Sequence, residues 1–177
     1  MTSAPTDAAL TPALAIAEED PRAPEAAAMI AALDADVDAR YGDLDDGHKV
    51  GPETLVARGA VFLVARRDGR AVACGALASL GDGTAEIKRM WSAPEARRSG
   101  AARAILRRLE DAARAQAVAV LRLETGPLQP EAIALYASEG FIEGGPFDGR
   151  GPHPHSTYMI KPLAPVDAAR NAKETAA

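Results

Sequence analysis

A short basic segment in the middle of the chain has the composition of a phosphate-binding turn. It reads Arg97-Arg98-Ser99-Gly100-Ala101-Ala102, and an amphipathic helical pattern follows it directly. The first amides of a helix lack intrahelical partners and carry partial positive charge, so they bind anions where no bulky side chain covers them. Gly100 and Ala102 leave the backbone accessible, and Arg97 and Arg98 add charge. Taken alone, the segment fits a phosphate site and an ordinary helix start about equally well.

The pattern of apolar residues predicts an α+β fold with a mixed sheet. Strands are expected over residues 14–17, 61–65, 72–80, 85–91, 118–124, 141–142 and 157–160, and helices over residues 24–41, 52–58, 101–115 and 130–139. Asp68-Gly69 predicts a tight hairpin between the second and third strands. In the fourth strand, alternation from Glu86 to Trp91 predicts two distinct faces, with Met90 on the face of Glu86 and Trp91 on the face of Ile87.

Length and composition limit the classes of protein to consider. The 177 residues suit one domain, which we expect over residues 13–163 between an N-terminal arm (1–12) and a C-terminal tail (164–177). The net charge of −5 argues against nucleic acid or an anionic membrane as partner. Cys74 is the only cysteine, so neither an intramolecular disulfide nor a thiolate metal cluster can form, which suits the cytoplasm. No uninterrupted apolar window is long enough to span a membrane.

Two motifs, in order and on the expected elements, resemble those of the GNAT family of N-acetyltransferases. The first is Arg97-x-x-Gly100-x-Ala102 after Met90-Trp91-Ser92-Ala93-Pro94-Glu95, and the second is Glu131-Ala132-Ile133-Ala134-Leu135-Tyr136-Ala137-Ser138-Glu139-Gly140-Phe141. The order of strands and helices is also similar, so the resemblance covers roughly residues 14–163. The chain departs from the family pattern at Arg98, where a glycine or other small-to-polar residue is usual, at Ala101, where a bulky aliphatic residue is usual, and at Ser92, where valine is common.

The resemblance implies a GNAT-like, largely antiparallel mixed sheet flanked by helices, with a cofactor site for acetyl-CoA. In the family, the strand that ends near Met90 to Ser92 splays away from the next strand, and pantetheine bonds to backbone groups in this wedge. The amides of Arg98 to Ala102 would hold the pyrophosphate. The cofactor-binding residues implied are Met90, Trp91, Ser92, Arg97, Arg98, Ser99, Gly100, Ala101 and Ala102.

The resemblance also implies catalytic roles. Tyr136 corresponds to a tyrosine that reprotonates the coenzyme thiolate, and its alternative role is that of a packed core aromatic. Glu86 is the candidate base, acting through water, with a salt bridge to Lys88 or Arg89 as the alternative. Glu124 is a second candidate base. An amine of low pKa would need no base at all.

The function expected is transfer of the acetyl group of acetyl-CoA to a primary amine of a small molecule, amino acid or peptide, by direct attack. The alternative is a non-catalytic module that binds or senses acyl-CoA. We expect no metal, because His153 and His155 stand in a polar loop with no further ligand cluster. The acidic run at residues 43–46 is expected to be solvated, with recognition of a cationic substrate as the lesser alternative. Neither nucleic acid nor a membrane is expected as partner, and a homodimer is left open.

Overall fold

The computed structural model describes residues 14–42 and 49–163. Its central element is a seven-stranded mixed sheet. The strands are β1 (Ala15–Glu18), β2 (Val61–Arg67), β3 (Arg70–Gly81), β4 (Thr84–Ser92), β5 (Val120–Thr125), β6 (Ile142–Glu143) and β7 (Thr157–Pro162). The helices are α1 (Pro24–Tyr41), α2 (Pro52–Ala57), α3 (Ala101–Ala115) and α4 (Pro130–Ser138), with a 3₁₀ turn η2 at Pro94–Ala96. The acidic run at residues 43–46 lies outside the described residues.

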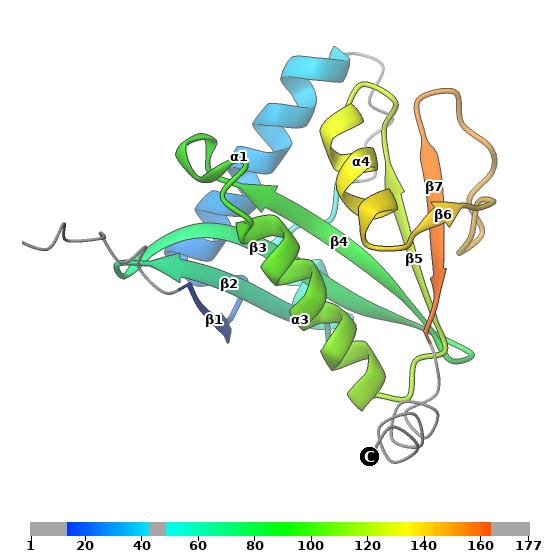
Figure 1. Cartoon of the computed structure of the whole chain (residues 1–177), viewed down its shortest axis with the longest axis horizontal. Coiled ribbons are helices and arrows are strands. Elements are labelled where there is room, and N and C mark those ends of the chain that lie inside the picture. The colour runs from blue at the N-terminus through cyan, green and yellow to red at the C-terminus, as the bar shows by residue number, and fades with distance from the viewer. Residues whose placement is uncertain (1–13, 43–48, 164–177) are drawn as a thin grey trace, which may run out of the picture.

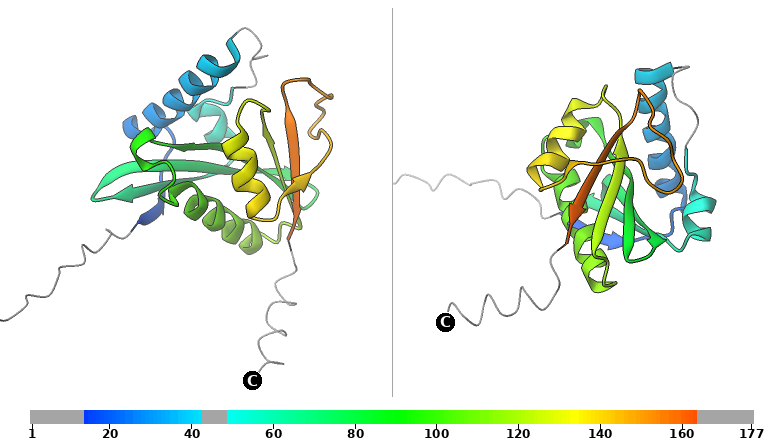
Figure 2. Two further views of the ribbon diagram at one scale, coloured as in Figure 1. Left: turned by 45° about the horizontal axis from the view of Figure 1, so that its top comes forward. Right: turned by 90° about the vertical axis from the view of Figure 1, so that its right-hand side faces the viewer.

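The sheet has the order β1-β2-β3-β4-β5-β7-β6, and β4–β5 is its one parallel pair among the described strands. This confirms the predicted α+β architecture. Helix α3 lies across one face with α4 beside it, and α1 lies on the other face (Figures 1 and 2). The α3 side of the core is built around Ile105, Leu106 and Leu109, and the α1 side around Ile30 and Phe62.

Strand β4 contains a β-bulge that the sequence pattern does not predict. Arg89 has a φ of +56°, in the left-handed region, and the register of β4 against β3 shifts between Cys74 and Ala76. The thiol of Cys74 donates a hydrogen bond of 3.5 Å to the carbonyl of Arg89, and burial raises the pKa of this thiol to about 12. The extra residue shifts the phase of the side chains along the rest of the strand.

The predicted alternation along β4 is therefore wrong beyond Lys88. Met90 packs with Ile87 on the α3 side, and a Cβ added to Gly75 would lie 2.5 Å from the sulfur of Met90. Trp91 turns to the opposite side, where its indole N–H donates to Asp36 on α1 at 3.0 Å.

The same region of β4 separates from β5. Their parallel pairing runs from Thr84↔Val120 to Ile87↔Leu123 and stops there, whereas β4 continues to Ser92. Figure 1 shows the two strands diverging toward α1 and α4. The expected wedge is therefore present, and the backbone groups that β4 and β5 turn toward each other there have no sheet partner, while β4 still pairs with β3 and β5 with β7.

Candidate active site

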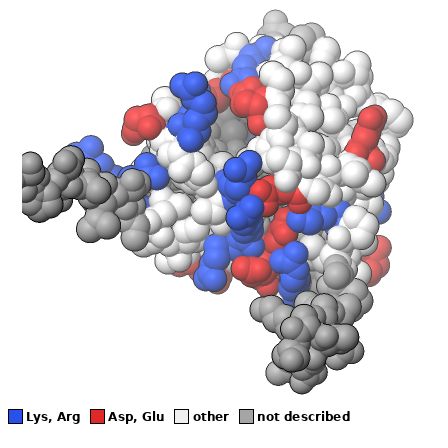
Figure 3. All heavy atoms as spheres, in the orientation of Figure 1, with Lys and Arg blue, Asp and Glu red and all other residues white. Residues whose placement is uncertain are grey.

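The turn before α3 presents an open helix N-terminus. Gly100 is the N-cap residue with a φ of +84°, and no side chain in the described part of the chain caps the first turn of α3. Arg98 also adopts a positive φ, of +61°, which accounts for the preference for glycine at this position in the resembling family. Basic side chains gather over this turn and along α3 (Figure 3). Uncapped amides and positive charge suit the end of α3 to a phosphate group.

Asp36 joins α1 to this turn. It accepts hydrogen bonds from the indole of Trp91 at 3.0 Å and from the guanidinium of Arg97 at 2.7 Å. The structure thus brings two of the predicted cofactor-binding residues together through a carboxylate on another element. Ser99 bonds locally, its hydroxyl donating to the carbonyl of Ala96 at 2.6 Å. The hydroxyl of Ser92 is buried without a hydrogen-bond partner among the described residues.

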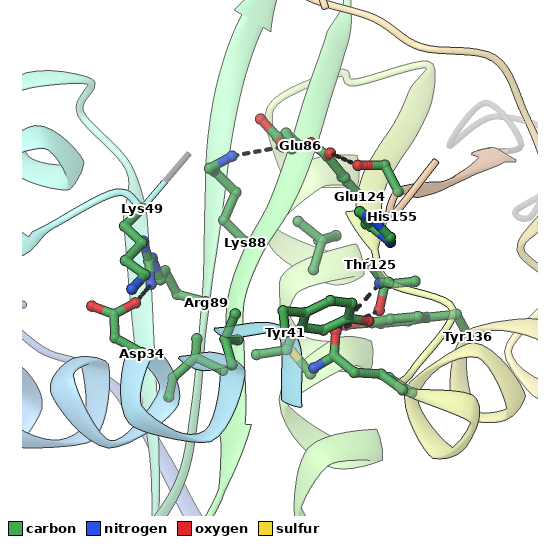
Figure 4. Close-up of a pocket in the computed structure, with 18 of the residues that line it drawn as sticks. Asp34, Tyr41, Lys49, Glu86, Lys88, Arg89, Glu124, Thr125, Tyr136 and His155 are labelled. Atoms are coloured by element: carbon green, nitrogen blue, oxygen red, sulfur yellow. Dashed lines mark hydrogen bonds and ion pairs between the residues drawn. The ribbon is translucent and has the colours of Figure 1, made fainter. Parts of the chain in front are cut away.

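A cavity of about 220 Å³ opens where β4 and β5 diverge. Figure 4 shows its walls, which come from α1, β4, β5, α4 and the loop before β7. Its polar and charged lining consists of Asp34, Tyr41, Lys49, Glu86, Lys88, Arg89, Glu124, Thr125, Gln129, Tyr136, His153, His155 and Ser156. The wedge, Tyr136 and both candidate bases therefore meet in one hollow.

Tyr136 reaches from α4 into this cavity (Figure 4). Its ring packs edge-on against Phe141 at a centroid distance of 5.8 Å, and its hydroxyl makes no hydrogen bond with any described residue. Burial raises the pKa of the phenol above its ordinary value, so it keeps its proton at neutral pH. The arrangement leaves that proton available to a ligand in the cavity.

The two candidate bases share one arginine. Arg150 donates to both oxygens of Glu86, at 2.8 and 2.9 Å, and to Glu124 at 2.8 Å. The ammonium of Lys88 also bonds Glu86, at 2.7 Å, and Ser156 donates to the other oxygen of Glu124 at 2.5 Å. The Glu86 side chain is 1% exposed, so this carboxylate is held as a buried ion pair.

Lys88 and Arg89, next to each other on β4, have different carboxylate partners. Burial lowers the pKa of Lys88 below its ordinary value, and the charge of Glu86 offsets part of that effect. Arg89 does not reach Glu86 and instead pairs with Asp34 on α1 at 2.5 Å. Of the two salt bridges weighed for Glu86, the structure contains the one to Lys88.

The C-terminal end of α1 is fastened over the cavity. The hydroxyl of Tyr41 accepts a hydrogen bond from the amide of Leu128 at 3.0 Å, and Arg40 donates to the carbonyl of Leu128 at 2.8 Å. Gly126 makes room for this contact, because a Cβ there would lie 1.8 Å from the Tyr41 oxygen. This clamp fixes the distance between α1 and the turn after β5.

Sequence reasoning missed Arg150, Tyr41 and Asp36. Arg150 lies in a loop with no regular pattern, 26 residues after Glu124. Tyr41 and Asp36 look like surface residues of a helix whose apolar stripe is blurred by alanine. The two loop histidines line the cavity, with ring centroids 5.5 Å apart.

No group of three or more potential metal-binding side chains occurs among residues 14–42 and 49–163. Within the same ranges, no helix has the length and apolar character needed to cross a membrane.

A splayed parallel strand pair beside an uncapped helix N-terminus defines an acyl-CoA-dependent acyltransferase. The chain belongs to the acetyltransferase (GNAT) family, whose model matches residues 17–141. It is 43% identical over 157 residues to an IAA acetyltransferase of Azospirillum brasilense, covering 86% of this chain and 99% of that protein.

Solved structures of similar proteins share this fold. A Klebsiella pneumoniae protein described as an acyl-CoA N-acyltransferase of inferred function is 35% identical, with a TM-score of 0.71 over 85% of this chain and 98% of that one. The PaiA N-acetyltransferase of Thermoplasma acidophilum, in complex with coenzyme A, shares the fold at 17% identity, with a TM-score of 0.66 over 85% and 99% of the two chains.

Proposed function

We propose that this acyltransferase moves the acetyl group of acetyl-CoA to a primary amine by direct attack. The observation that carries the proposal is the hydroxyl of Tyr136, which has no hydrogen-bond partner among the described residues and lies in the cavity where β4 separates from β5. An acetyl thioester in the wedge would meet free backbone groups of β4 on one side and a protonated phenol on the other.

The residues present fit a coenzyme A ligand. The open amides of Arg98 to Ala102 would receive the pyrophosphate at the start of α3, with Arg97 and Arg98 beside them. Backbone groups of Met90, Trp91 and Ser92 would hold the pantetheine arm, because β4 has no pairing to β5 beyond Ile87. Arg97 would then exchange part of its contact with Asp36 for the ligand.

The chain's residues have distinct tasks in the reaction. The amine nitrogen attacks the thioester carbonyl, a new C–N bond forms and the C–S bond breaks. Tyr136 gives its proton to the departing thiolate and is reprotonated, through water, by the proton that the nitrogen releases as the amide forms. The ammonium proton must leave before attack, and Glu86 and Glu124 remain candidates to receive it through water. Both carboxylates already accept hydrogen bonds from Arg150.

Binding and turnover are tested separately. At 100 times its Kd, acetyl-CoA should stabilise the folded state by about 2.7 kcal/mol, visible as a rise in Tm. Thiol release should then be followed over small amines, amino acids and peptides, with IAA included because of the relative's name. Stabilisation without turnover on any acceptor would instead support an acyl-CoA-binding module.

Tyr136→Phe tests the chemical step. The variant should lose about 10²- to 10⁴-fold in kcat with acetyl-CoA affinity kept, as expected for loss of a general acid. Ser138→Ala is the control, because it also removes one hydroxyl from α4, and this hydroxyl donates to the carbonyl of Leu135 at 2.7 Å outside the cavity around Tyr136. An undiminished kcat in Tyr136→Phe would remove this tyrosine from the mechanism.

A further inference from the structure

A second, larger cavity adjoins the one that holds Tyr136. It has a volume of about 650 Å³ and lies between α2, β4, β5 and the loop from Asp148 to His153. Lys49, Lys88, Glu124 and His153 line both cavities. The two hollows are therefore neighbouring parts of one site, and an acceptor with its amine near Tyr136 would extend its other end into the second.

Cations exceed carboxylates in this second cavity. Its basic residues are Lys49, Arg58, Lys88 and Arg150, and its acidic residues are Glu124 and Asp148. Two carboxylates outside the lining pair with three of these cations: Glu86 with Lys88 and Arg150, and Asp38 with Lys49. Arg58 is therefore the cation that carries the excess positive charge. Asp148 is 3.8 Å from Arg150 and 41% exposed, so it neutralises little of the remaining charge.

Two of the cations have donors left over. The guanidinium of Arg58, at the end of α2, makes no hydrogen bond or ion pair with any residue that the structure describes. Lys88 is 12% exposed, yet Glu86 is the one carboxylate bonded to its ammonium within the described chain. Burial lowers the pKa of Lys88, so a second negative group beside it would favour its charged form.

We propose that the acceptor carries a carboxylate as well as the amine, and that this carboxylate binds in the second cavity between Arg58 and Lys88. The inference rests on the proposed amine acetylation and narrows its substrate to amino acids and similar amino-carboxylates. Charge-assisted bonds from two cations would fix the carboxylate, and the amine would then point toward the wedge.

Matched pairs of acceptors test the proposal. Each amino acid is compared with its own carboxamide, which keeps the amine and side chain but removes the negative charge. The free acid should have a kcat/KM at least about tenfold higher, most of it in KM, and added salt should narrow the difference. Carboxamides acetylated as well as the acids, or better, would overturn the inference and leave the proposed function standing.

Substitution of Arg58 tests whether this residue binds the carboxylate of the acceptor. Arg58→Ala should raise KM for the acid and reduce the acid-to-carboxamide ratio several-fold, and Arg58→Lys should restore part of it. Arg108→Ala is the control, because Arg108 is an exposed arginine of α3 outside both cavities. A ratio that does not respond to Arg58→Ala would contradict this placement of the carboxylate.

A binding measurement separates the inference from turnover. N-acetyl amino acids, the products of the proposed reaction, should raise the Tm of the wild-type protein more than their carboxamides do. The difference should shrink in Arg58→Ala. Equal shifts from both ligands would refute the carboxylate site even if no acceptor were turned over.

Discussion

Arg150 is the cation that pairs with both candidate bases of the site. It is 13% exposed and bonds two carboxylates, of which Glu86 is 1% and Glu124 19% exposed. Its guanidinium also lies 4.7 Å from the centre of the Phe147 ring. One cation therefore joins β4 to β5 beside the last residues of their parallel pairing, which ends at Ile87↔Leu123.

Arg150→Met keeps the volume of the side chain and removes its charge. The buried carboxylates would lose their main partner, so the free energy of unfolding should fall by about 3–5 kcal/mol in urea titrations. Arg22→Met breaks an exposed pair with Asp20 and should change stability little by comparison.

A second substitution tests whether charge is the cause of the loss in Arg150→Met. Without Arg150, buried Glu86 keeps Lys88 as its one bonded cation among the described residues. Adding Glu86→Gln removes the negative charge and should therefore restore part of the lost stability at pH 7. A deficit unchanged by Glu86→Gln would mean that lost packing, not charge, is responsible.

At the scale of elements, the start of α3 depends on a glycine for two separable reasons. Gly100→Ala places a methyl group at a φ of +84°, which should cost about 1 kcal/mol of stability. The methyl would also stand where a phosphate must approach the amides. Affinity for acetyl-CoA should therefore fall more than affinity for acetyl-pantetheine, which has no pyrophosphate.

Gly69→Ala is the matched control for this experiment. Gly69 has a φ of +77° at the β2–β3 turn, and its added methyl would also meet nothing within 4 Å. The same backbone strain should lower stability there without changing the affinity for either ligand, as calorimetric titration would show. Equal effects of Gly100→Ala on both ligands would argue against a phosphate at α3.

The α1 clamp makes a prediction about the acceptor side. Gly126→Ala forces a Cβ against the ring of Tyr41, with 1.8 Å to its oxygen and 2.4 Å to the adjacent carbon. Stability should fall by about 1–3 kcal/mol, and KM for the acceptor should rise because α1 shifts. In a Tyr41→Ala background the same substitution should cost much less, since the obstructing ring is gone.

Gly145→Ala is the matched control. It introduces a methyl at a position without a positive φ, and no atom of the described residues lies within 4 Å of it, so stability and KM should stay close to wild type. Additive effects of Gly126→Ala and Tyr41→Ala would show that the two residues do not collide.

Across the whole molecule, one lysine connects strand β7 to helices α3 and α4. The ammonium of Lys161 on β7 donates to Glu110 of α3 at 2.6 Å and to the carbonyl of Glu139 after α4 at 2.5 Å. Lys161→Met should lower the free energy of unfolding by up to about 3 kcal/mol, because Arg114 still pairs with buried Glu110 at 3.2 Å. Acetyl-CoA affinity should not change, which separates this loss from the effects at α3.

Much of the architecture could be predicted from the sequence because local signals marked it. Helix α3 has the predicted bounds, since its apolar face repeats without interruption and Gly100 marks its start. The hairpin at Asp68-Gly69 also forms as predicted, between β2 and β3. β1 lies one residue later than expected and β3 extends two residues earlier, because pairing with neighbouring strands, rather than composition, decides where a strand ends.

The bulge in β4 and the ion pairs of Arg150 could not be predicted from local sequence patterns. The bulge at Arg89 has no glycine to mark it, and it reverses the faces on which Met90 and Trp91 lie. The pairing of Arg150 with Glu86 joins residues 64 positions apart through a loop without periodicity. Such contacts follow from the folded topology and carry no signal in local spacing.

The buried thiol opposite the β4 bulge has a practical consequence for enzymology. Cys74 is the only cysteine, it is fully buried, and its pKa of about 12 keeps it un-ionised at assay pH. Native protein should therefore show no reaction with an aromatic disulfide reagent at pH 8, and denatured protein one thiol per chain. Colour developed in a reaction mixture would then report coenzyme A alone, so the enzyme can be assayed at high concentration against slow acceptors without a blank of its own.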